Sequence, residues 1–89
     1  MSECITAAAI RLPAGKIVSV PAPGSHQDAL RAAREAGTFY AEIHGSEQGF
    51  ITSAGRFVDR RKAARIAVAA GQRQRATGPQ DLLFSDDVW

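Results

Sequence analysis

The stretch GFITSAGRFVDRRKAARIA, Gly49 to Ala67, decides the fold because it joins a strand pattern to a helix pattern within a few residues. FITS and RFV flank Ala54-Gly55, and a glycine that takes a positive φ in the turn is typical of a β-hairpin. Asp59 then stands where a helix N-cap is expected, and alanines recur after it at helical spacing. We therefore expect a hairpin over residues 49–58 and a basic helix over residues 59–70.

Upstream of this stretch, a hairpin and a helix are expected in the same order. ITAAAIRLPAGKIVSVPAP alternates apolar and mixed positions around PAG, which predicts a hairpin over residues 5–20. SHQDALRAAREAG predicts a helix over residues 25–36, which Ser25 caps with Asp28 three residues on. Between these two units, TFYAEIH has the aromatic and β-favouring residues of a strand over residues 38–44.

These elements predict an α+β fold: a small antiparallel sheet from two β-hairpins plus a middle strand, with two helices packed on one face. At 89 residues the chain is expected to form a single domain with a small core. The end LLFSDDVW carries apolar groups that are costly to leave in water, so we expect residues 82–89 to dock on the domain or on a partner. The larger apolar side chains are expected to fill the core: Ile10, Leu12, Ile17, Val18, Val20, Leu30, Phe39, Ile43, Phe50, Ile51, Phe57, Val58, Ile66 and Val68.

Composition and charge exclude several classes of protein. The single cysteine, Cys4, excludes an internal disulfide framework and a zinc site built from clustered cysteines, and no apolar run approaches the length of a membrane span. Because the start lacks a basic and apolar leader, the sequence predicts a cytoplasmic protein. The net charge is +2, but residues 56–75 carry seven bases against one acid, whereas residues 81–89 carry three acids and no base. Either the acidic end folds back onto the basic helix, or that helix meets an external anionic partner.

The candidate site residues are those whose chemistry suits an anion. His26 stands at a helix start, where free N–H groups bind anions, Thr52 and Ser53 add hydroxyls, and Arg56 and Arg60 add guanidinium groups suited to phosphate. The alternative is that these are ordinary surface residues of a turn and a helix. No catalytic constellation and no metal-ligand spacing is found in the sequence, so we expect no metal and no cofactor.

Three segments of the chain resemble a family of small phage and prophage proteins. They are ITAAAI with VSVPAPG, then QGFITSAGRFVDR with AARIA, and finally the ending LFSDDVW, and together they cover nearly the whole chain. The family pattern has a paired histidine near the start of the first helix, where this chain has His26 and Gln27. It also has an acid in the first turn of the second helix, where this chain has Arg61 and Lys62. The second helix is therefore more basic than the resemblance implies.

The resemblance implies a phage-encoded accessory protein. We expect it to inhibit a bacterial defence system by direct, non-enzymatic protein binding, as an anti-CRISPR protein acts on a complex of Cas proteins. A homodimer is a further expectation because the core is small. The alternatives are a protein that binds or processes a nucleotide or a phosphorylated small molecule, and a nucleic-acid-binding regulator that uses residues 60–65. The candidate contacts to a host protein are Arg60, Arg61, Lys62, Arg65, Asp86, Asp87 and Trp89.

Overall fold

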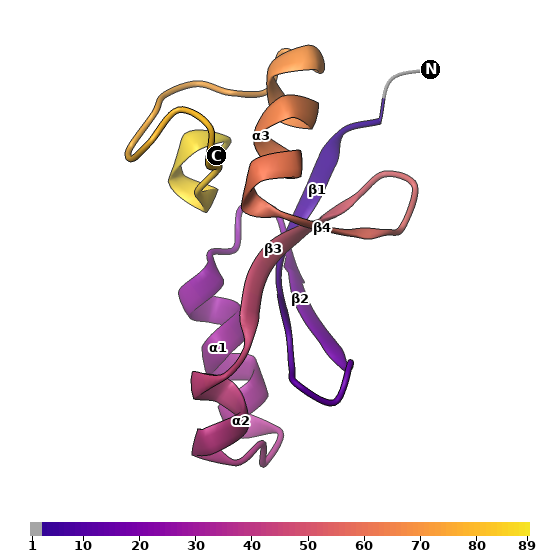
Figure 1. Cartoon of the computed structure of the whole chain (residues 1–89), viewed down its shortest axis with the longest axis vertical. Helices are drawn as coiled ribbons and strands as arrows, with labels where there is room; N and C mark the ends of the chain where they lie inside the picture. The colour runs from indigo at the N-terminus through magenta and orange to yellow at the C-terminus, as the bar shows by residue number, and fades with distance from the viewer. Residues whose placement is uncertain (1–2) are drawn as a thin grey trace.

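A computed structural model of the chain describes residues 3–89, and four strands in this part form one antiparallel sheet (Figure 1). β1 (Ile5–Arg11) and β2 (Ile17–Pro21) form the first hairpin, and β3 (Glu47–Thr52) and β4 (Phe57–Asp59) form the second. The strand order is β2-β1-β3-β4, because β1 pairs with β2 on one side and with β3 on the other. The predicted α+β fold with two hairpins in an antiparallel sheet is confirmed.

Two helices of ten residues cover one face of the sheet. α1 (His26–Glu35) packs on β1 and β2, and α3 (Arg60–Ala69) packs on β3 and β4. Both helices begin near the middle of the molecule and run toward opposite ends (Figure 1). Alanines form most of the buried helix surface, which lets each helix backbone approach the sheet closely. One core cluster, around Phe50, lies under α3, and the other, around Ile10, lies under α1.

The middle strand predicted over residues 38–44 is wrong, because this segment contains the short helix α2 (Tyr40–His44). The Ile43 N–H donates to the Phe39 carbonyl oxygen at 3.2 Å, and the Gly45 N–H donates to the Ala41 carbonyl oxygen at 3.1 Å. Phe39 and Tyr40 are 76% and 74% exposed, so no burial of their rings stabilises an extended strand. Both edges of β1 are already paired, and local helical hydrogen bonds satisfy this backbone instead.

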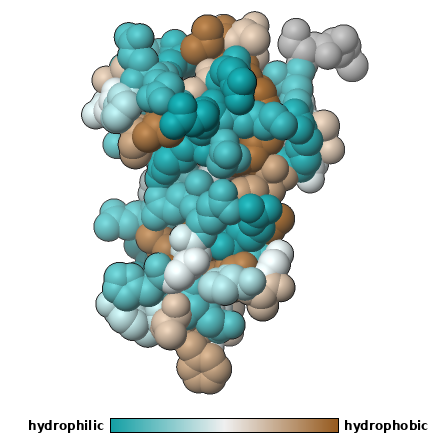
Figure 2. Space-filling view, in the orientation of Figure 1, coloured by the Kyte–Doolittle hydropathy of each residue, from teal (hydrophilic) through white to brown (hydrophobic). Residues whose placement is uncertain are grey.

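Three of the predicted core residues are also wrong. Phe39, Ile17 and Val68 are all exposed. Phe39 lies at the α2 end of the molecule, where an apolar group protrudes in Figure 2. Elsewhere on that face, hydrophilic groups predominate and brown apolar groups are scattered (Figure 2). The exposed position of Val68 follows from its place on the outer side of α3, away from the buried Ala63 and Ala67.

The C-terminal segment, defined here as residues 72–89, packs against the domain. It leaves α3 at Gly71, runs without regular structure, and ends in the 3-10 helix η1 (Ser85–Asp87). The Gln72 amide joins it to β1, since its Oε1 accepts from the Ile5 N–H at 2.7 Å and its Nε2 donates to the Ile5 carbonyl at 2.9 Å. Leu83 and Val88 are buried in the same core cluster as Phe50. Within residues 3–89, no helix combines the length and apolar character needed to cross a membrane.

Candidate functional site

The five candidate ligand residues lie in two separate places. Thr52, Ser53 and Arg56 lie at the turn of the second hairpin and hold the beginning of the described chain. The Glu3 carboxylate accepts from Arg56 Nε and Nη2, both at 2.7 Å, and from the Thr52 hydroxyl. The Cys4 N–H donates to Ser53 Oγ at 3.0 Å. These hydrogen bonds, those from Arg56 above all, lower the pKa of Glu3 to about 2. This group therefore fastens the chain beside β1 to the hairpin turn.

His26 and Arg60, by contrast, line one cleft of about 480 Å³. Its walls come from the beginning of α1, from β3, from the beginning of α3 and from the C-terminal segment. This volume is within the range of small-ligand sites. We call it the His26–Arg60 cleft, and its lining consists of Ser25, His26, Gln27, Leu30, Gln48, Arg60, Thr77, Phe84, Ser85 and Asp86.

His26 is the first residue of α1, and its ring contacts the Phe50 ring and the Gly49 carbonyl oxygen. The capping box between Ser25 and Asp28 fixes the start of the helix. The ring lies edge-on to Phe50 with the centroids 4.8 Å apart, and Nε2 is 2.7 Å from the Gly49 carbonyl oxygen. Because a carbonyl only accepts, the proton of the neutral ring is on Nε2, and Nδ1 carries the lone pair.

Burial is the main cause that lowers the pKa of His26, and the nearby Arg60 charge lowers it further, against the opposing effect of the bond to Gly49. The residue is 7% exposed, and its ring is neutral at pH 7. No hydrogen bond among the described residues uses Nδ1. Nδ1 of His26, a residue that lines the cleft, therefore keeps an unused acceptor lone pair.

Gly49, whose carbonyl oxygen contacts His26, is required for the close pairing of β3 with β4. A Cβ at this position would collide with the Val58 carbonyl oxygen and with the Phe57 ring. The absence of a side chain lets β4 and the Phe57 ring lie close to β3, while the Gly49 carbonyl faces the imidazole. The requirement for glycine here was not predicted from the sequence.

Arg60 is the first residue of α3 and is half-buried beneath the C-terminal segment. Its Nη1 donates to the Leu83 carbonyl oxygen at 2.7 Å, its Nη2 donates to Gln48 Oε1, and the guanidinium carbon lies 4.4 Å from the centre of the Phe84 ring. Burial lowers its pKa, and Asp87 opposes this change, yet an arginine stays charged. The structure thus separates Arg60 from the exposed basic face on which the sequence placed it.

Asp87 holds the C-terminal segment in this position. Its side chain is 0% exposed and accepts from the Phe84 N–H at 2.9 Å, from the Thr77 N–H at 2.8 Å and hydroxyl at 2.9 Å, and from Arg73 at 3.3 Å. Burial raises the pKa of Asp87, but these hydrogen bonds outweigh burial and the net shift is downward. Asp87, a predicted partner contact, is therefore not accessible to a partner.

The other two predicted contacts at the chain end have different environments. Asp86 is exposed and lines the cleft. Trp89 is half-buried: its Nε1 donates to the Gly24 carbonyl oxygen at 2.8 Å, and its ring lies edge-on to Phe50. The terminal tryptophan therefore fixes the approach to α1, and the exposed bases that remain on α3 are Arg61, Lys62 and Arg65.

The cleft offers one set of donors and another of acceptors. Arg60 carries charge and has five N–H groups, of which two are used, and the Gln48 amide keeps its NH₂ because its oxygen accepts from Arg60. On the acceptor side are His26 Nδ1 and the Asp86 carboxylate. This arrangement suits a ligand with an anionic group at Arg60 and Gln48 and with hydroxyl donors toward His26 and Asp86. Across residues 3–89, no three His, Cys, Asp or Glu side chains are grouped as a metal site would need.

A family model described as phage T4 y16D protein matches residues 4–89. The matched range contains the whole His26–Arg60 cleft, including the wall formed by the C-terminal segment. No curated protein and no solved structure matches the chain.

Proposed function

Because the chain belongs to the phage T4 y16D protein family, we propose that it is a phage accessory protein whose His26–Arg60 cleft binds a small phosphorylated metabolite, such as a nucleotide. The observation that carries the proposal is the convergence of a charged arginine and a neutral histidine on one cleft. The two residues are 34 positions apart in the sequence and begin different helices. A guanidinium that is partly shielded from water attracts a phosphate more strongly than an exposed one.

The groups that line the cleft support the same ligand class. Phe84 lies against Arg60, and a Cβ on Gly78 would collide with the Phe84 ring, so this ring is already packed by the protein. The ligand is therefore recognised mainly by hydrogen bonds and charge. The acceptors His26 Nδ1 and Asp86 favour a phosphate ester that also carries hydroxyl groups over inorganic phosphate.

The sharpest test is the substitution Gln48→Glu. The glutamate keeps an oxygen that accepts from Arg60, so the fold is retained, but it removes the NH₂ donor and adds a negative charge beside the anion. We expect isothermal titration calorimetry with nucleoside monophosphates and ribose 5-phosphate to show binding to the unaltered chain, and a loss of affinity of about tenfold or more in Gln48→Glu, equivalent to about 1.4 kcal/mol.

The matched control is Gln80→Glu, which makes the same change outside the cleft. This variant is expected to bind as the unaltered chain does. If none of these phosphate esters binds, or if the two variants lose affinity equally, the proposal is wrong.

A second candidate function is inhibition of a bacterial defence complex by direct protein binding. The observation that favours it is the exposed basic surface of α3, formed by Arg61, Lys62 and Arg65, in which Arg61 and Arg65 line the same hollow as the exposed Val68. Apolar surface surrounded by charge is typical of a protein-binding site. Expression of the protein in hosts with an active CRISPR system is expected to raise the plating efficiency of a targeted phage, and equal plating with and without the protein would contradict this function.

A further inference from the structure

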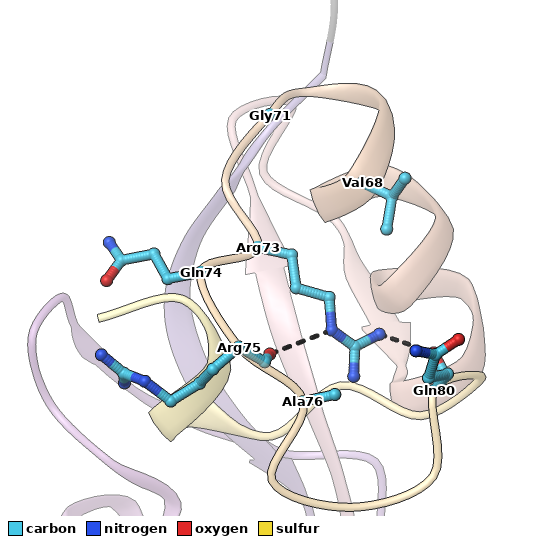
Figure 3. A pocket seen from close by; sticks show the side chains of 7 residues that line it. All are labelled: Val68, Gly71, Arg73, Gln74, Arg75, Ala76 and Gln80. Carbon is cyan, nitrogen blue, oxygen red and sulfur yellow. Dashed lines mark hydrogen bonds between the residues drawn. The ribbon is translucent and has the colours of Figure 1, made fainter.

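A groove runs between the outer side of α3 and residues 73–81. It comprises two adjoining hollows of about 470 and 400 Å³, which share Val68 and Gln80 in their linings. Figure 3 shows one hollow, with Val68 on α3 and the Arg73 side chain extending from the facing segment toward Gln80. Val68 is 63% exposed here, and the exposed Ala69 continues the apolar surface along the helix.

The wall of the groove that faces α3 is held in place by hydrogen bonds from Arg73. The Arg73 guanidinium donates to the carbonyl oxygens of Arg75 at 3.2 Å and Gln80 at 2.5 Å (Figure 3). It also donates to the Leu82 carbonyl oxygen at 3.2 Å and contacts the buried Asp87. The Arg73 side chain therefore holds the two ends of the loop formed by residues 73–82 together. The groove is formed before any partner arrives, so little conformational entropy is lost when it is filled.

The charge around the groove is positive. Four arginines and one aspartate line the two hollows, and the buried Asp87 pairs with one of the arginines, Arg73, which leaves a net charge of +2. The aspartate, Asp81, pairs with Arg61 at 2.9 Å. Arg65 is exposed and has no ion pair among the described residues, so its charge is available to a partner. The groove is thus apolar along its helix side and cationic at its rim.

We infer that this groove binds an acidic segment of a partner protein, one that places an apolar side chain over Val68 and a carboxylate beside Arg65. This inference gives the second candidate function its contact surface and rests on it. The positive charge of the rim favours an anionic occupant, and the aliphatic surface at Val68 and Ala69 favours an occupant with an apolar side chain. No aromatic side chain lines either hollow, so the stacking surface that a single-stranded nucleic acid uses is absent from this part of the described chain.

The test uses three fluorescein-labelled amphipathic peptides of about 15 residues, which is about four helical turns. The first has leucines on one face and glutamates beside them, the second replaces the glutamates by lysines, and the third replaces the leucines by serines. A single-stranded oligothymidine is the fourth probe. Fluorescence anisotropy is expected to show binding of the first peptide alone. Absence of binding by that peptide, equal binding by the lysine or serine peptide, or binding of the oligonucleotide in its place would overturn the inference.

Two variants locate the contact. Arg65→Glu and Val68→Ser change exposed side chains of the groove, so both are expected to fold normally and to weaken binding of the acidic peptide by about tenfold. Lys62→Glu makes a comparable charge reversal on α3 outside the groove and is expected to have a smaller effect. Equal effects of Arg65→Glu and Lys62→Glu would show attraction by the net charge alone and would contradict the groove.

The experiments distinguish failure of the groove from failure of the anti-defence function. If the acidic peptide binds in the groove but defended hosts still resist the phage, the surface exists and the anti-defence function is wrong. If phage plating rises but Arg65→Glu and Val68→Ser act as well as the unaltered chain, the function stands and the groove is not its contact. Neither variant touches the His26–Arg60 cleft, so phosphate-ester binding is expected to be unchanged in both.

Discussion

Replacement of Asp87 by alanine is expected to lower the free energy of unfolding by about 3–5 kcal/mol, because the change removes one partner of a buried ion pair. It also leaves the Phe84 N–H and both donors of Thr77 without their acceptor. For a domain of this size the loss is a large part of the total stability, which is about 0.05–0.15 kcal/mol per residue. Urea unfolding followed by circular dichroism measures it.

The neighbouring acid supplies the control for this prediction. Asp86 is exposed, and its carboxylate forms no hydrogen bond or ion pair among the described residues. Asp86→Ala is therefore expected to change the free energy of unfolding by less than about 0.5 kcal/mol. Similar values for the two variants would show that Asp87 does not hold the C-terminal segment.

Phe50→Ala is expected to cost about 3–5 kcal/mol of stability, because the substitution leaves a large cavity in the core. Phe50 is fully buried, and its ring contacts both His26 and Trp89. The variant removes the support beneath the imidazole as well as the contact with the chain end, so phosphate-ester binding is expected to weaken together with stability. Urea unfolding and calorimetry on the same preparations measure the two effects.

Phe39→Ala removes the same phenyl ring from an exposed position on the N-terminal side of α2. It is expected to change stability by less than about 0.5 kcal/mol and to leave ligand binding unaltered. A comparable loss in Phe39→Ala and Phe50→Ala would contradict the core assignment.

The sequence predicted the elements whose signals are local. The capping box at Ser25, the N-cap at Asp59 and the turn at Gly55 depend on neighbouring residues, and each is present in the structure. The segment over residues 38–44 was assigned wrongly because its aromatic residues favour a strand only when a sheet edge buries them. Whether such an edge is available depends on the pairing of β1, which no local pattern encodes.

The cleft was predictable only in part for the same reason. His26 and Arg60 were recognised by their chemistry, but Thr52, Ser53 and Arg56 were grouped with them because they are near Arg60 in the sequence. The second hairpin directs those three side chains to the opposite end of β3, toward Glu3. Asp87, predicted as a contact to a host protein, is instead a buried centre of hydrogen bonds through contacts with residues 73 and 77. Such long-range contacts leave no periodic pattern.

Nitrogen-15 NMR of the imidazole rings tests the central claim, that the His26–Arg60 cleft binds a phosphate ester, most directly. The chain has two histidines, and His44, exposed on α2, serves as the internal reference. In the free protein His26 is expected to titrate below its ordinary pKa of 6.5, with the proton on Nε2. Saturation with a nucleoside monophosphate is expected to shift the Nδ1 resonance of His26, because that nitrogen accepts a hydrogen bond from a ligand hydroxyl group. An unchanged His26 spectrum at saturating ligand, or equal changes at His26 and His44, would contradict the account.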